Sequence, residues 1–140
     1  MMHDKSLLTD KTFMDAQERR RALEEISKRS QKTAQWLGYL LDREKRLTTD
    51  ANAYSERYTK RQYGLAVAPI VRRELIRARI LAATTPKGLS LEEIAKILKI
   101  QPAEVMPHVV ALRRRGQLFM ERMEQQTTPI YKAIEQTEES

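Results

Sequence analysis

The chain has 140 residues, of which 41% are apolar, 6% aromatic and 32% charged, and its net charge is +7. It contains no cysteine, which excludes disulfides, a thiol nucleophile and thiolate metal ligands. No apolar run approaches the roughly 18 residues of a membrane span, and the start of the chain lacks the form of a signal peptide. We therefore expect a cytoplasmic protein with no membrane association.

The first part of the chain is predicted to form one long helix, from Lys11 to about Leu47, because proline is absent there and Gly38 is the single glycine. Apolar residues recur along it at spacings of three and four, with Ser30, Thr33 and Glu44 also on this seam. This a/d pattern favours a partner helix from a second copy. The residues predicted to dimerise are Leu23, Ile26, Leu37, Leu40 and Leu47. The alternative is an ordinary amphipathic helix on a globular core. We expect residues 1–63 to be a helical, dimerising extension.

A shorter helix is predicted from about Ala51 to Gln62, after the turn formers at residues 48–50. Tyr54 and Tyr58 lie one turn apart on it among basic residues. Such tyrosines could stack on single-stranded nucleic acid, but packing against a neighbouring helix with exposed hydroxyls is the favoured interpretation.

The apolar segment Gly64–Ala68 is predicted to be a hinge that opens a second domain, residues 64–135. Pro69 suits the first turn of a helix that runs to about Ala83. Its apolar face is wide enough to be buried on two sides. Residues 84–88 are expected to form a loop, and residues 136–140 a disordered tail.

Ser90 to Glu93 have the S-x-x-E form of a helix-capping box. Apolar residues at i, i+3, i+4 and i+7 then predict a helix to Leu98, and Pro102 opens a second helix after a short turn. This second helix ends in three arginines and Gly116, which is typical of a helix C-terminus. Two strand-like runs follow, Leu118–Met123 and Ile130–Ile134, joined by a polar turn.

Helix, tight turn, helix and β-hairpin follow one another over Val71–Ile134, and this order resembles the winged helix-turn-helix superfamily. The predicted fold class is thus mainly α with a small β-hairpin, a winged helix preceded by a helical extension. Small bacterial, plasmid and phage DNA-binding regulators have such folds, but other winged helices bind proteins, so the fold does not decide the function.

The resemblance implies that the second helix of the motif enters the major groove while the hairpin lies along the backbone or minor groove. Its exposed face would then consist of Gln101, Ala103, Glu104, Met106, Pro107 and Val110. Arg113 and Arg114 suit phosphate contacts, although complementing the helix dipole would equally explain them. The hairpin contributes Arg122, Gln126, Thr127 and Lys132. Ser90 could bind phosphate at a helix N-terminus.

The two histidines, His3 and His108, form no cluster with metal-ligand spacing, and phosphate-binding glycine loops are absent from the sequence. We therefore expect no enzyme activity, no metal and no cofactor. The positive charge favours double-stranded DNA as the partner. The leading hypothesis is a homodimeric transcription regulator, a repressor or activator that acts by operator occupancy. The alternative is a module that docks a protein partner in a replication, segregation, conjugation or transcription assembly, and the apolar face at Met106, Pro107 and Val110 favours it.

Overall fold

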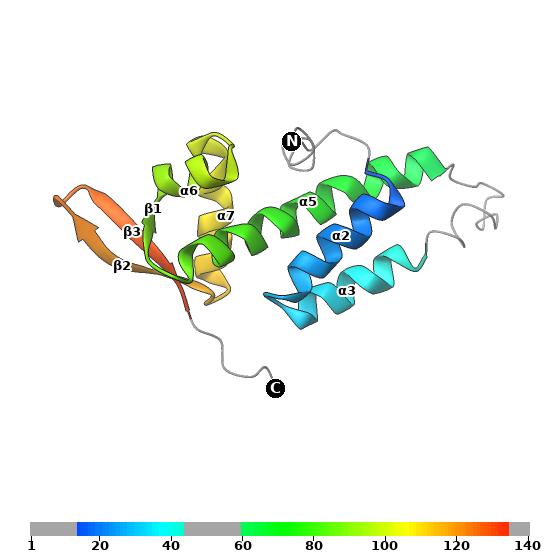
Figure 1. Cartoon of the computed structure of the whole chain (residues 1–140), viewed down its shortest axis with the longest axis horizontal. Helices are drawn as coiled ribbons and strands as arrows, with labels where there is room; N and C mark the ends of the chain where they lie inside the picture. The colour runs from blue at the N-terminus through cyan, green and yellow to red at the C-terminus, as the bar shows by residue number, and fades with distance from the viewer. Residues whose placement is uncertain (1–13, 44–59, 135–140) are drawn as a thin grey trace. The chain divides into compact units, whose positions relative to one another are not determined.

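A computed structural model describes residues 14–43 and 60–134, which form five helices and a three-stranded antiparallel sheet (Figure 1). The elements are α2 (Ala16–Ser27), α3 (Gln31–Leu41), α5 (Lys60–Thr84), β1 (Leu89–Ser90), α6 (Leu91–Leu98), α7 (Pro102–Arg114), β2 (Leu118–Glu124) and β3 (Thr128–Ala133). The chain divides into two compact units, residues 1–75 and 76–140, and the division falls inside α5. This division lies further along the chain than the domain boundary expected after Tyr63.

The first unit contains two short helices where the sequence predicts one long helix, so that prediction is wrong. The chain breaks after Ser27, and Ser30 caps α3 by accepting a hydrogen bond from the amide of Thr33 at 3.2 Å. The hydroxyl of Ser30 also donates to that of Thr33 at 3.0 Å. A serine side chain that satisfies a helix N-terminus stabilises a new helix start. Ser30 and Thr33, two of the three polar residues on the predicted seam, therefore form a cap.

Two of the five residues of the predicted dimer seam lie in the core of this unit. Ile26 and Leu37 are buried within a single chain, while Leu23 and Leu40 are half-buried, and Leu47 lies outside the described residues. Tyr63 of α5 joins this core, because its hydroxyl donates to the Leu40 carbonyl at 2.7 Å. Ile26 and Leu37 thus stabilise the fold of one chain instead of forming an exposed seam.

Helix α5 runs through Gly64–Ala68, so the predicted hinge is wrong and the helix begins well before Pro69. Val67 and Ala68 are buried, and this burial favours continuing the helix. Pro69 lies inside the helix, where it cannot donate a hydrogen bond. Its ring is exposed, and Leu65, whose carbonyl would have accepted that bond, is also exposed. The helix predicted over residues 51–62, with Tyr54 and Tyr58, lies outside the described residues for most of its length.

The helix pair of the second unit is confirmed close to its predicted bounds. Ser90 and Glu93 form the expected capping box at the start of α6. Lys99 ends α6 in a left-handed conformation, with φ of 63°, and α7 begins at Pro102. Gly116, with φ of 73°, follows the end of α7. The core of this unit includes one buried face from each helix, formed by Ile94, Ala95, Leu98, Val105, Val109 and Leu112.

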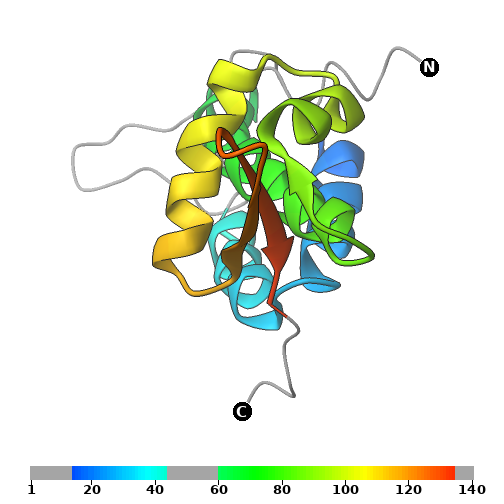
Figure 2. The same ribbon diagram turned by 90° about the vertical axis from the view of Figure 1, so that its left-hand side faces the viewer.

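The hairpin of β2 and β3 is also confirmed, but the sheet contains a third strand that the sequence analysis missed. The two-residue strand β1 pairs with β3, and the strand order is β1-β3-β2. Figure 2 shows the hairpin between α7 and β1. In β2 the register shifts between Met120 and Arg122, so Glu121 is an extra residue of a β-bulge. Within the described part of the chain, no helix has the length and apolarity that a membrane span requires.

Candidate nucleic-acid interface

The outer face of α7 is open to solvent along its length. Every residue predicted for this face is exposed: Gln101, Ala103, Glu104, Met106, Pro107 and Val110. The opposite face, with Val105, Val109 and Leu112, is buried, so packing fixes which side of α7 points outward. The structure thus places the predicted recognition residues together on one surface.

This surface is apolar at its centre. Met106 and Val110 are 43% and 39% exposed, and Pro107 lies inside the helix between them. Glu104 accepts a hydrogen bond from the backbone amide of Gln101 at 3.1 Å, so its carboxylate helps to cap α7. Gln101 and Glu104 are the polar groups of this face, and at least one of them, Glu104, is used in capping the helix. The face therefore suits methyl contacts and shape recognition better than many base-specific hydrogen bonds.

The arginines at the end of α7 differ in their surroundings. The guanidinium carbon of Arg113 lies 6.0 Å from the centre of the Tyr131 ring, a cation–π contact that ties α7 to β3. Arg114 is exposed, and no carboxylate among the described residues forms an ion pair with it. Arg114 is thus better placed than Arg113 to exchange water for a phosphate.

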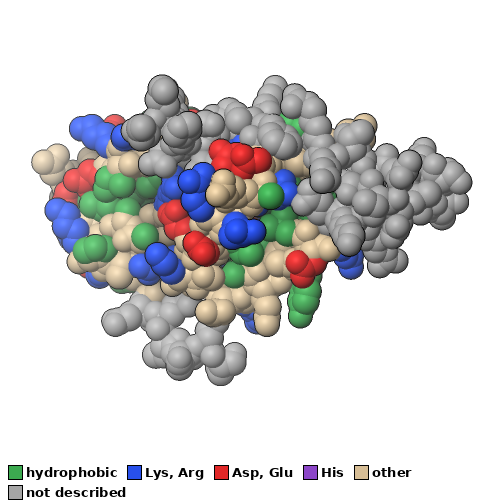
Figure 3. All heavy atoms as spheres, turned by 45° about the vertical axis from the view of Figure 1, so that its right-hand side comes forward, with side chains coloured by type: hydrophobic (Ala, Val, Ile, Leu, Met, Phe, Trp, Pro, Cys, Tyr) green, Lys and Arg blue, Asp and Glu red, His purple; other side chains and the backbone are tan. Residues whose placement is uncertain are grey.

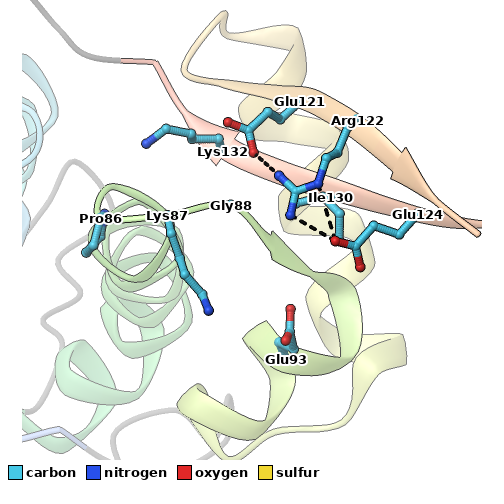
Figure 4. Close-up of a pocket in the computed structure, with 9 residues that line it drawn as sticks. All are labelled: Pro86, Lys87, Gly88, Glu93, Glu121, Arg122, Glu124, Ile130 and Lys132. Carbon is cyan, nitrogen blue, oxygen red and sulfur yellow. Dashed lines mark hydrogen bonds and ion pairs between the residues drawn. The ribbon is translucent and has the colours of Figure 1, made fainter.

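The two cations expected to act from the hairpin, Arg122 and Lys132, both have hydrogen-bond acceptors within the unit. Arg122 lies between two carboxylates, donating to Glu121 at 2.6 Å and to Glu124 at 2.9 and 3.3 Å (Figure 4). The hydrogen bond to Glu124 raises the pKa of Arg122 above its ordinary value. Lys132 donates to the backbone carbonyl of Thr85 at 2.8 Å. Both cations therefore already have acceptors within the unit, and a phosphate would have to share or replace them.

The tip of the hairpin has an unfavourable backbone conformation for its residues. Gln125 and Gln126 have φ of 53° and 61°, and the amide of Thr127 donates to the Glu124 carbonyl at 3.1 Å. These are the features of a type I′ turn, for which asparagine and glycine are the favoured residues. Glutamines there cost stability, and such strain is often found at functional positions. Gln126 and Thr127 are exposed at this tip, as predicted.

Ser90 is engaged in the cap of α6. Its hydroxyl accepts from the amide of Glu93 at 3.2 Å, and its own amide donates to the Glu93 carboxylate at 2.9 Å. That backbone hydrogen bond is the main cause of a lowered pKa for Glu93, and the hydroxyl of Ser90 and the charges of Lys87 and Lys96 add to it. A phosphate at this helix start would meet a carboxylate that stays ionised.

Sequence reasoning missed the pocket beside the hairpin, which has a volume of about 330 Å³. It is lined mainly by charged side chains of both signs and is shown in Figure 4. The lining residues are Pro86, Lys87, Gly88, Glu93, Glu121, Arg122, Glu124, Ile130 and Lys132. The bulge at Glu121 helps to form it, and a bulge has no distinct signal in the sequence.

The second unit is basic over its described residues. Residues 76–134 contain ten Lys and Arg against five Glu, a net charge of +5. On the face shown in Figure 3, however, basic side chains are interspersed with acidic and apolar ones. No group of three or more metal-ligating side chains is arranged to hold an ion within the described ranges. The charge therefore favours a polyanion without forming one continuous basic field on that face.

Comparison with known proteins gives no relative: no family model, no curated protein and no solved structure matches the chain.

Proposed function

We propose that the chain is a dimeric double-stranded DNA-binding protein, and that it regulates transcription by occupying an operator. In this proposal the second unit is a winged helix-turn-helix. The end of α5, then α6, the turn at Lys99 and α7 would be its three helices, and β2 and β3 its wing. The third strand β1, paired with β3 ahead of the helix pair, supports this interpretation because it gives the wing a sheet.

The observation that carries the proposal is the exposed outer face of α7 with Arg114 at its end. A helix of 13 residues with one buried and one open side can enter the major groove. Ala103, Met106 and Val110 would then contact thymine methyl groups or report groove shape. Arg114 would contact the phosphate backbone, and counterion release would supply most of the affinity.

A dimer would place two copies of α7 on half-sites related by a two-fold axis, about one DNA turn apart. Because Ile26 and Leu37 are buried in one chain, the self-association surface would consist mainly of other residues. On α3, Trp36 and Tyr39 are 50% and 66% exposed, and exposed aromatics of this kind are typical of interaction surfaces.

Binding to random duplex DNA at increasing salt tests the proposal. We expect micromolar binding at low salt that weakens steeply as salt rises. Arg114→Ala should weaken binding to all sequences and flatten the logarithmic salt dependence by about 0.9, the value for one lost phosphate contact. Arg21→Ala, an equal change at an exposed arginine of α2, is the control and should have a smaller effect. Absence of binding at low salt would refute the proposal.

The second candidate function is docking of a protein partner through α7. Exposed Met106 and Val110 on either side of Pro107 favour it, because an apolar patch on one helix face suits a protein groove. The salt titration discriminates between the two functions. A chain that ignores duplex DNA at low salt but binds a protein through Met106 and Val110 would support docking.

A further inference from the structure

Two carboxylates of β2 hold the guanidinium of Arg122 in the pocket beside the hairpin. Glu121 binds Nη1 at 2.6 Å, while Glu124 binds Nη2 at 2.9 Å and Nε at 3.3 Å. All three nitrogens of the guanidinium therefore donate to acids of the same strand, as the dashed lines in Figure 4 show. At neutral pH this cluster has a net charge of −1.

Local backbone structure produces this arrangement. The β-bulge leaves Glu121 without a partner on β3, while Arg122 pairs with Ile130. A bulge re-aims the extra side chain, so that neighbouring residues can share one face of the strand. Gly88 then leaves room for Glu121, since a Cβ at residue 88 would lie 2.5 Å from its carboxylate oxygen. The cluster is thus supported by the fold as well as by the attraction of its charges.

Resting on the proposed DNA-binding function, we propose that Glu121 and Glu124 compete with DNA phosphate for Arg122 and so limit the contribution of the wing to affinity. The ion pairs are half-exposed, with the Arg122 side chain at 52%, and exposed pairs of this kind are weak enough to be exchanged. Exchange still leaves two carboxylates beside the phosphate, and their repulsion opposes the new contact. Arg122 is therefore a latent phosphate ligand.

The competition can be measured with the variant Glu121→Gln/Glu124→Gln, which keeps the shape of both side chains and removes their charge. It should bind duplex DNA at least about five-fold more tightly than the wild type, equivalent to about 1 kcal/mol. The logarithmic salt slope should steepen by about 0.9, the value for one added phosphate contact. Fluorescence anisotropy with a labelled random-sequence duplex gives both quantities.

Arg122→Gln in both backgrounds separates this competition from a general gain in positive charge. If the carboxylates act by occupying Arg122, the two Glu→Gln changes should raise the affinity for DNA by less than about two-fold when Arg122 is absent. Equal gains with and without Arg122 would overturn the proposal. Glu92→Gln is a control for Glu124→Gln, because Glu92 is an exposed carboxylate of α6 that takes no part in the capping box. Glu92→Gln should change the affinity for DNA less than Glu124→Gln does.

The outcomes also distinguish this inference from the proposed function. If the wild type and the double variant bind DNA equally tightly, the competition is refuted and the proposed DNA binding stands. Absence of binding by both proteins at low salt would refute both proposals. Thermal unfolding of each variant confirms that the affinities compare folded proteins.

Discussion

The Nε–H group of Arg77 donates a hydrogen bond to Nδ1 of His108 at 3.1 Å, and this bond joins α5 to α7 inside the second unit. Because Nδ1 accepts, the neutral ring of His108 bears its proton on Nε2. His108 is half-buried on the flank of α7. The contact helps to fix the rotation of α7, and with it the direction of the exposed face.

His108→Ala should destabilise the chain by about 1 kcal/mol, because the Arg77 donor then loses a half-buried acceptor. Urea unfolding followed by circular dichroism measures this loss. Val110→Ala is the control on the same helix, since Val110 is exposed and its loss should change stability by less than about 0.5 kcal/mol. Equal effects of the two changes would show that the hydrogen bond contributes nothing.

Glu93→Gln should remove a pH-dependent part of the stability. The Glu93 carboxylate has a lowered pKa in the folded chain, chiefly because it accepts a hydrogen bond from the backbone of Ser90. Its contribution is therefore full above the ordinary value of 4.5 and is lost as pH falls through the lower folded pKa. The variant should melt below the wild type at about pH 7, and the difference should shrink towards about pH 3. A difference independent of pH would contradict this role.

The sequence was most informative where short-range signals agree with one another. Ser90 and Glu93 mark the start of α6, Pro102 the start of α7, and Gly116 its end. Each signal acts within one helical turn, where hydrogen bonding and backbone geometry are decided by neighbours along the chain. The exposed face of α7 then followed from the period of its apolar residues.

The predictions failed where several local choices were compatible with the sequence. Ser30 can stand on a seam or cap a helix, and burial of Ile26 and Leu37 in one chain favours the cap. Gly64 resembles a hinge residue, but it lies buried in α5. The ion pairs of Arg122 depend on a β-bulge and on side-chain rotamers, which leave no periodic signal. The side-chain contacts of the candidate site were therefore less predictable than the helices and strands on which they lie.

Gly88→Ala should destabilise the second unit by about 1–3 kcal/mol, as overpacking does in a tight site. The new Cβ would lie 2.7 Å from Cγ2 of buried Ile130, and 2.5 Å from a carboxylate oxygen of Glu121. Glu121 can move aside, but Ile130 is part of the core. Gly38→Ala is the matched control.

At Gly38, in the middle of α3, a Cβ would meet no atom of the described residues within 4 Å outside its own helix backbone and its chain neighbours. Alanine there should stabilise the chain by about 0.5–1 kcal/mol, because glycine is a poor helix former. Thermal unfolding distinguishes the two substitutions by their opposite signs. A stabilising Gly88→Ala would show that the approach of Ile130 is not tight.

Gln125→Asn/Gln126→Gly should stabilise the hairpin and weaken DNA binding at the same time. Both residues have positive φ, and Asn-Gly fits a type I′ turn better by about 1 kcal/mol. The same substitutions shorten or remove the side chains that the proposed wing would present to the DNA backbone. Thermal unfolding and anisotropy on duplex DNA measure the two effects. Gln35→Gly, in the middle of α3, is the control for replacing glutamine by glycine outside the turn. It should destabilise the chain by about 1 kcal/mol. If stability rises with unchanged DNA affinity, the tip of the hairpin does not contact DNA, and its strain has a different origin.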